Sequence, residues 1–181
     1  MGRPKALLEL EGRTFVHRVV RALAEGGCAP VLVVTAPGDD EVAAEARGAG
    51  ARTVMNPDPG EGPITSLRLA IGKLDEAVAG LAYLPVDHPL VRPETVAHLL
   101  SEARASGALL TIPMRGNKRG HPPIFRRPLF AELADPALEG GARTVVHRHL
   151  GAAELVPVDD PGVTADIDTP ESYRAAAGER S

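Results

Sequence analysis

Carboxylates that directly follow apolar runs are the first candidates for chemistry in this sequence. Asp87 ends the run 80–86, and Asp166 and Asp168 lie near the C-terminus. In α/β proteins ligands bind beyond the carboxyl ends of strands, and hydrated Mg²⁺ typically takes one or two carboxylates together with substrate phosphates. Spacing alone favours simpler explanations, an Asx turn at Asp87 and a helix start after Asp168. A functional role requires Asp87 to meet Asp166 or Asp168 around a metal ion.

Cationic side chains are the second group of candidates. Lys5 follows a proline in an extended N-terminal segment and can neutralise a triphosphate, although most lysines near a terminus are simply solvated. The loop 114–123 holds Lys118, Arg119 and His121 and can contact an anionic substrate. A solvated hairpin loop is the alternative interpretation of that segment.

Patterns for zinc binding and covalent catalysis are missing from the sequence. The six histidines are scattered, and His147 and His149 do not share a helix face. There is no Gly-x-Ser-x-Gly, Walker A or Cys–His pattern. The single cysteine, Cys28, precedes an apolar run, which is typical of a small core residue, and it excludes an internal disulfide.

Composition narrows the function classes further. The chain has 181 residues, with 20 Lys and Arg against 24 Asp and Glu, and aromatics make up 3%. An acidic chain with few aromatic residues argues against nucleic-acid binding. No apolar run approaches the roughly 20 residues that span a bilayer, and the N-terminus lacks a signal-peptide pattern. We expect one cytoplasmic domain over residues 1–181, with no membrane partner.

Helical and extended patterns alternate along the chain and must position these candidates. The continuous β-branched run 30–35 is typical of a strand buried on both faces. Alternation of strand and helix predicts an α/β three-layer sandwich with a mostly parallel, Rossmann-like sheet. Expected strands cover 30–35, 51–55, 80–86, 107–112, 153–158 and 163–167, and expected helices cover 14–25, 39–47, 65–74, 93–103, 128–133, 142–150 and 170–177.

Several motifs, in order, resemble the MobA-like nucleotidyltransferase family, most closely its molybdenum cofactor cytidylyltransferase branch. The resemblance covers essentially the whole chain. It is carried by Met1-Gly2-Arg3-Pro4-Lys5, Asn56-Pro57, Gly62 with Ser66-Leu67-Arg68, Asp87-His88-Pro89-Leu90-Val91, Gly120-His121-Pro122-Pro123, Gly141-Ala142-Arg143 and Asp166-Ile167-Asp168-Thr169-Pro170-Glu171.

This resemblance implies a nucleotide-diphospho-sugar transferase type of sheet and a Mg²⁺-dependent reaction. A nucleotide monophosphate from an NTP, with CTP favoured and GTP as the alternative, joins a phosphorylated cofactor precursor such as molybdopterin, and pyrophosphate leaves. It implies a catalytic role for Lys5, Asp87 and Asp168, with Asp87 and Asp168 holding the metal. It further implies nucleotide or substrate contacts from Arg3, Asn56, Gly62, Ser66, Lys118, Gly120, His121 and Pro122, and a molybdoenzyme as a protein partner.

The sequence departs from the family pattern at its N-terminus, where the first strand and the glycine-rich loop of the signature are absent ahead of Arg3. Loss of a central strand is expected to expose both neighbouring strands. Two explanations stand: a start further upstream, which we favour, or a non-catalytic member. Three functions therefore remain open: cofactor nucleotidyl transfer, a nucleotide- or cofactor-binding module that assists molybdoenzyme maturation, and nucleotidyl transfer to another phosphorylated substrate.

Overall fold

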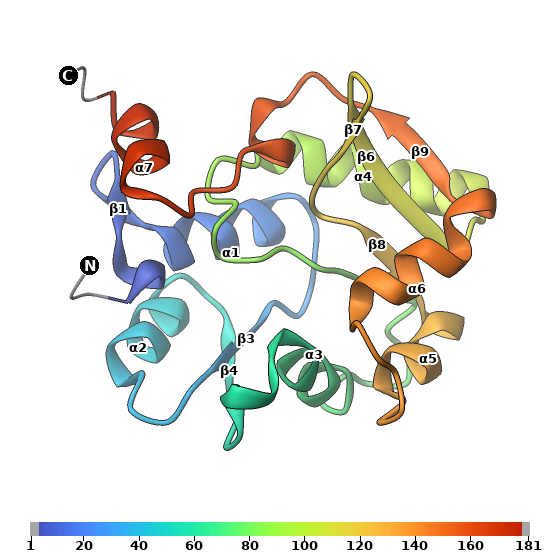
Figure 1. The fold of residues 1–181 in the computed structure, drawn as a ribbon, viewed down its shortest axis with the longest axis horizontal. Helices are drawn as coiled ribbons and strands as arrows, with labels where there is room; N and C mark the ends of the chain where they lie inside the picture. Colours follow the sequence, from blue (N-terminus) through green and yellow to red (C-terminus); the bar gives the residue numbers. More distant parts are fainter. Residues whose placement is uncertain (1–3, 179–181) are drawn as a thin grey trace.

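The computed structural model describes residues 4–178 (Figure 1). Strand β6 (Leu110–Arg115) is the central strand of the larger sheet. It pairs in parallel with β9 (Glu154–Pro157) and antiparallel with β8 (Ile124–Arg126) and β7 (Lys118–Arg119). Strand β5 (Gly80–Ala82) continues the sheet beyond β8. A separate parallel pair consists of β3 (Leu32–Thr35) and β4 (Arg52–Met55), and a short hairpin of β1 (Glu9–Leu10) and β2 (Arg13–Thr14) lies near the N-terminus.

Helices cover both faces of the larger sheet, which confirms the predicted three-layer α/β fold. Neighbouring residues of β8 show the two faces, because adjacent side chains of a strand point in opposite directions. Ile124 packs with Leu99 and Ala103 of α4 (Pro93–Ser106). Phe125 packs with Leu67 of α3 and with side chains that belong to the opposite helical layer. That layer consists of α3 (Pro63–Ile71), α5 (Phe130–Ala134) and α6 (Ala142–His149).

The other helices agree with the sequence patterns that predicted them. The large apolar side chains of α1 (Phe15–Glu25) are all buried, and the Thr14 hydroxyl accepts a hydrogen bond from the His17 N–H to cap the helix. Helix α2 (Asp40–Gly48) begins with two acidic residues, which suit the positive end of a helix. Helix α7 (Pro170–Ala176) begins with a capping box between Thr169 and Ser172.

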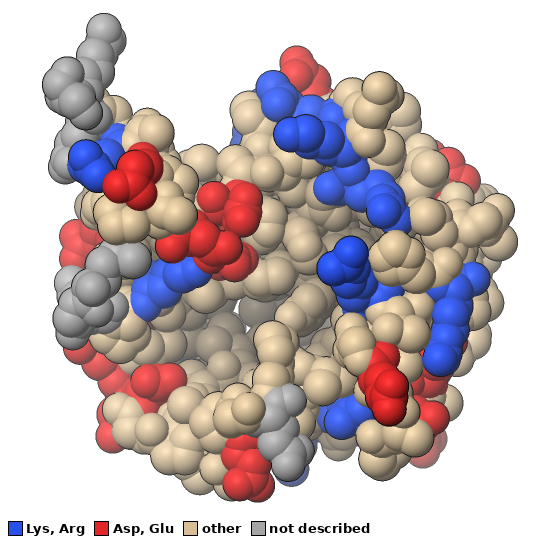
Figure 2. All heavy atoms as spheres, in the orientation of Figure 1, with Lys and Arg blue, Asp and Glu red and all other residues tan. Residues whose placement is uncertain are grey.

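An apolar slot separates β3 from β5. Strand β3 pairs with β4 alone, and β5 pairs with β8 alone, among the described residues. The slot has a volume of about 1130 Å³ and is lined by residues 31–34 and 79–87, with further wall residues from α1, α3, α4 and β8. The expected exposure of both neighbouring strands is therefore present, and Figure 2 shows this face of the molecule hollowed near its centre.

Two local predictions were wrong. The run 30–35 was predicted to be buried on both faces, but Leu32, Val33 and Val34 are only half-buried because they border the slot. The run 163–167 was predicted to be a strand, but a 3-10 turn covers Pro161–Thr164. The Asp160 carboxylate accepts a hydrogen bond from the Gly162 N–H and bends the chain there.

Candidate active site

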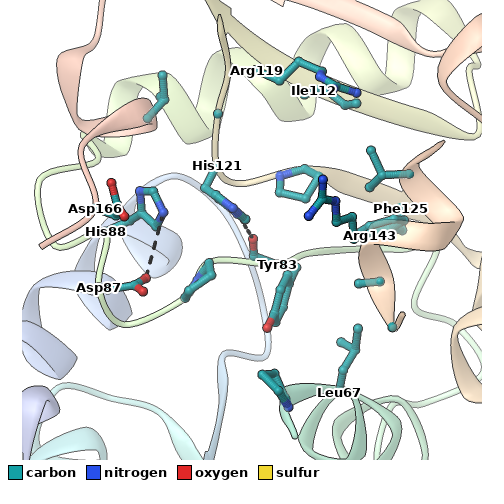
Figure 3. Close-up of a pocket in the computed structure, with 18 of the residues that line it drawn as sticks. Leu67, Tyr83, Asp87, His88, Ile112, Arg119, His121, Phe125, Arg143 and Asp166 are labelled. Atoms are coloured by element: carbon teal, nitrogen blue, oxygen red, sulfur yellow. Dashed lines mark hydrogen bonds and ion pairs between the residues drawn. The ribbon is translucent and has the colours of Figure 1, made fainter. Parts of the chain in front are cut away.

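A polar cleft of about 1050 Å³ opens beside the slot. Its walls come from loops that follow strands and from the first turns of α3 and α6 (Figure 3). Asp87, His88 and Asp166 lie on one side, and Arg119 and Arg143 lie on the other. Lys118 also lines the cleft. The Tyr83 and Phe125 rings with Leu67 line the apolar part between them. Of the predicted carboxylates, Asp87 and Asp166 therefore border one cavity with the predicted cationic loop, whereas Asp168 does not line it.

The loop that carries Asp87 is fixed by the C-terminal segment. The Ile167 N–H donates to the Asp87 carbonyl over 2.8 Å, and the Ile167 side chain is buried. Asp166 and Asp168 flank this residue and are both exposed. The alternation predicted for these three residues is present, and it places both carboxylates beside the Asp87 loop.

The Asp160 side chain joins the C-terminal segment to the residues that follow the Asp87 loop. Its side chain is 1% exposed and accepts hydrogen bonds from the Arg92 N–H, the Thr95 hydroxyl and the Gly162 N–H. Gly162 packs so closely on Leu90 that an added Cβ would lie 2.3 Å from the Leu90 carbonyl oxygen. Glycine is therefore needed where the C-terminal segment crosses the loop that follows Asp87.

The donor set fits a hydrated divalent cation. The Oδ1 atom of Asp87 is buried and lacks a hydrogen-bond donor, which is costly for a carboxylate unless a cation approaches it. Residues 4–178 contain no group of three or more His, Cys, Asp or Glu side chains arranged to hold a metal together. One or two carboxylates completed by water and phosphate oxygens are the usual magnesium ligands. Asp87 with Asp166 or Asp168 can supply such a set.

Lys5 and Asp168, both predicted to be catalytic, form an ion pair. The hydrogen bond and the charge of Lys5 lower the pKa of the Asp168 carboxyl. Asp166 lines the cleft, whereas Lys5 lines the slot. The three side chains thus bring a cation and two carboxylates to the place where the slot and the cleft adjoin. Arg3, also predicted to bind nucleotide, lies outside the described residues.

Two histidines stack at the centre of the site. The rings of His88 and His121 lie 4.5 Å apart, and His121 Nδ1 lies 3.5 Å from the Tyr83 carbonyl oxygen. Burial, followed by the neighbouring His88, lowers the pKa of His121, so this imidazole is neutral at pH 7. Burial and the nearby Asp87 charge raise the pKa of the Tyr83 hydroxyl, which stays protonated.

The predicted substrate loop is held close to the C-terminal segment. The His121 N–H donates to the Val163 carbonyl over 2.8 Å, and a Cβ on Gly120 would lie 2.4 Å from the same oxygen. The peptide bond between His121 and Pro122 is cis. Gly120 and His121 line the cleft together with Lys118.

Asn56, Gly62 and Ser66 come together at the start of α3. The Asn56 side chain is buried and donates to the Thr65 and Ser66 hydroxyls, while its carbonyl oxygen accepts from the Asp58 N–H. Gly62 has φ 92° and precedes the helix at the edge of the cleft. In this arrangement Asn56 positions the loop, and Gly62 is the member of the trio that borders the cleft.

The sequence-based candidates omitted Tyr83 and His147 and assigned no role to Arg143. Arg143 and His147 project from one face of α6, and the Nε atom of Arg143 lies 3.4 Å from His147 Nε2. Their spacing of four residues within a predicted helix was the available signal. In Figure 2, basic side chains gather on the rim of the hollow opposite a group of acidic side chains.

The sequence of this chain is similar to those of known proteins. The model of the MobA-like NTP transferase domain matches residues 1–154. The chain belongs to this family. Over 100% of its length it is 30% identical to a probable molybdenum cofactor guanylyltransferase of Mycobacterium avium, of which 90% is covered. It is 31% identical to the nicotine blue oxidoreductase of Paenarthrobacter nicotinovorans, with 96% of the chain and 89% of that protein covered.

Solved structures share the fold of this family member. The Rv0371c protein of Mycobacterium tuberculosis in complex with manganese has a TM-score of 0.81 and 25% identity, with 98% of this chain and 93% of that chain covered. Some relatives are much longer, and the chain spans 26% of one of them. Within the described residues, the helices are too short or too polar to cross a membrane.

Proposed function

We propose that the protein transfers a nucleotide monophosphate from an NTP to the phosphate of a small acceptor and releases pyrophosphate. The observation that carries this proposal is the cleft in which Asp87 and Asp166 lie opposite Arg119 and Arg143, and which Lys118 also lines. Carboxylates that hold a metal and cations that hold phosphates are the parts phosphoryl-transfer chemistry needs. Membership of an NTP transferase family supports the same reaction class.

The residues act by positioning and charge neutralisation. An oxygen of the acceptor phosphate attacks the α-phosphorus in line, and the bond from that phosphorus to the oxygen bridging to the β-phosphate breaks. Asp87 and Asp168, with Asp166 beside them, would hold Mg²⁺, which neutralises phosphate charge when bound. Lys5 stabilises charge on the triphosphate, and Lys118 and Arg143 orient the acceptor. The reaction needs no nucleophilic side chain.

We favour CTP as the nucleotide, with GTP as the alternative, and a molybdopterin-like phosphorylated precursor as the acceptor. The Gly120–Pro122 loop and the Arg143 segment support the cytidylyl assignment, whereas one relative is named a molybdenum cofactor guanylyltransferase. Arg3, Asn56, Gly62, Ser66, Lys118, Gly120, His121 and Pro122 are proposed to contact nucleotide or acceptor. We also propose one domain over residues 1–181, a cytoplasmic location and a molybdoenzyme as protein partner.

A transfer assay tests this function. The purified chain is mixed with CTP, GTP or ATP, Mg²⁺ and a phosphorylated acceptor, and pyrophosphate release is measured for the wild type and for Asp87→Asn. Release that depends on acceptor and is lost in the variant supports the proposal. Nucleotide binding without turnover would instead identify the non-catalytic binding module, and turnover with a different acceptor would reassign the substrate.

A further inference from the structure

His88 contributes nothing to the reaction described so far, although it lines the cleft next to Asp87. Its side chain is 9% exposed. The Nδ1 atom of His88 lies 3.4 Å from the Gly162 carbonyl oxygen. A carbonyl oxygen only accepts hydrogen bonds, so this contact places the proton on Nδ1. That leaves Nε2 as the ring nitrogen that a cation can reach.

The other ring nitrogen, Nε2, lies beside the Asp87 carboxylate. The distance from Nε2 to Asp87 Oδ1 is 3.9 Å, which is too long for a hydrogen bond (Figure 3). That Oδ1 is also the buried oxygen that lacks a donor. A ring nitrogen and a buried carboxylate oxygen without a donor, at this separation, can bind one cation between them.

The surroundings of His88 resemble those of a metal-binding histidine. Such histidines usually donate the second ring N–H to a carbonyl or carboxylate, which fixes the tautomer and the ring orientation. Gly162 supplies that carbonyl, and the close contact of Gly162 with Leu90 holds it in place. The ring of His121 packs against the other side of the imidazole and limits its rotation.

We propose that His88 Nε2 is a metal ligand beside Asp87 Oδ1 and that it makes this site prefer Mn²⁺ over Mg²⁺. Imidazole nitrogen is accepted by first-row transition metals, of which Mn²⁺ binds it least tightly, whereas Mg²⁺ favours an all-oxygen shell, so an imidazole ligand still shifts the balance from Mg²⁺ towards Mn²⁺. The inference deepens the proposed function, because it rests on Asp87 as a metal ligand. It assigns the choice of metal to a residue that the sequence motifs left without a role.

Pulsed electron paramagnetic resonance of the Mn²⁺-loaded protein tests the ligand directly. With ¹⁴N and ¹⁵N-histidine samples, the wild type is expected to show a nitrogen coupling to Mn²⁺ that changes with the isotope. The coupling should disappear in His88→Gln and remain in His98→Gln, a matched change at an exposed histidine of α4. Absence of the coupling in the wild-type protein overturns the proposal, even where His88→Gln does not fold.

Metal competition tests the preference. The dissociation constants for Mn²⁺ and Mg²⁺ are measured by titration calorimetry without substrates. His88→Gln is expected to weaken Mn²⁺ binding about tenfold and to change Mg²⁺ binding less than about twofold. Equal losses for both metals, or no loss for Mn²⁺, would contradict the proposal. Neither readout depends on turnover, so nucleotidyl transfer with Mg²⁺ can persist while this inference fails.

Discussion

The polar cleft and the apolar slot are adjacent cavities of similar volume with opposite chemistry. They share the stretch of chain from Tyr83 to Asp87 as a common wall. The cleft is bounded by loops whose carboxylates, imidazoles and cations have few partners. The slot is bounded by strand edges and by the apolar faces of α1 and α3. Buried charged groups without a partner indicate a binding or catalytic site, whereas unpaired strand edges indicate a surface on which another segment can pack.

The largest expected effect separates activity from stability in the cleft. The buried Oδ1 atom of Asp87 accepts no hydrogen bond, so its charge is not stabilised by the fold. Asp87→Asn removes that charge, and the melting temperature should stay the same or rise. Transfer activity should fall about a thousandfold, because this carboxylate acts on phosphate charge through the metal. Initial rates and thermal unfolding measure the two effects. A matching loss of stability would show that Asp87 is a structural residue instead.

Asp160 provides the opposite case, a buried carboxylate whose oxygens are all engaged. Asp160→Asn weakens acceptors for Arg92, Thr95 and Gly162 and should lower the free energy of unfolding by about 3 kcal/mol. Urea denaturation measures the change. The neighbouring exposed carboxylate serves as a control, and Asp159→Asn should change stability by less than about 0.5 kcal/mol. Equal effects from both variants would remove the distinction between engaged and unengaged carboxylates.

The basic wall of the cleft can be tested with two arginines of α6. Arg143→Gln should raise the KM for the phosphorylated acceptor about tenfold and change kcat little, because the side chain lines the cleft and binds ground state and transition state alike. Arg148 pairs with Glu132 instead of lining the cleft, so Arg148→Gln should leave KM unchanged. Steady-state kinetics distinguishes them. A shift of similar size in both variants would point to a general effect of helix charge.

A pair of valines compares packing at the slot with packing in the closed core. Val156→Ala in β9 removes two buried methyl groups and should cost about 2 kcal/mol of stability. Val33→Ala in β3 should cost less than about 1 kcal/mol, since Val33 is half-buried at the slot. Both values come from urea denaturation at pH 7. Equal costs would mean that the slot is closed in solution.

The smallest expected effect is on stability and concerns Glu132 of α5, which pairs with Arg148 and His149 of α6. Hydrogen bonds from Arg148 and then His149 lower the pKa of Glu132 below its ordinary 4.5. The ionised form is therefore stabilised by folding, and the stabilisation is present above about pH 4.5 and lost as the pH falls through the lowered pKa. Glu132→Gln should cost a few tenths of a kcal/mol at pH 7 and nothing at acid pH. A cost independent of pH would refute this.

Sequence patterns predicted most elements because local periodicity and capping determined them. Helix α1 followed from its apolar spacing and from Thr14, and α7 followed from Thr169 and Pro170. The segment 163–167 was apolar enough for a strand. The Asp160 carboxylate instead accepts a hydrogen bond from the Gly162 N–H, and tertiary contacts with Leu90 and His121 determine the path of the chain. Such long-range contacts have no local signature.

Sequence motifs predicted several residues of the candidate site but not the contacts that these residues make with one another. Motif order suggested Asp87, Asp168, Lys118 and His121. Asp87, Lys118 and His121 line one cleft, whereas Asp168 does not line it and pairs with Lys5 of the slot. The stacking of His88 on His121 joins residues that are 33 positions apart, and only the fold brings them together. The engagement of Asn56 with Thr65 and Ser66 likewise depends on how one loop closes over the start of α3.

The common wall of the two cavities has a dynamic consequence. The segment that ends at Asp87 carries a hydrogen-bonded neighbour strand on one side and the slot on the other. Amide protons of residues 81–86 should therefore exchange with solvent faster than those of β6, which has partners on both sides. The position of the Asp87 carboxylate therefore depends on how rigid residues 81–86 are. Any occupant that orders the wall of the slot would therefore also fix the position of Asp87, which lines both cavities.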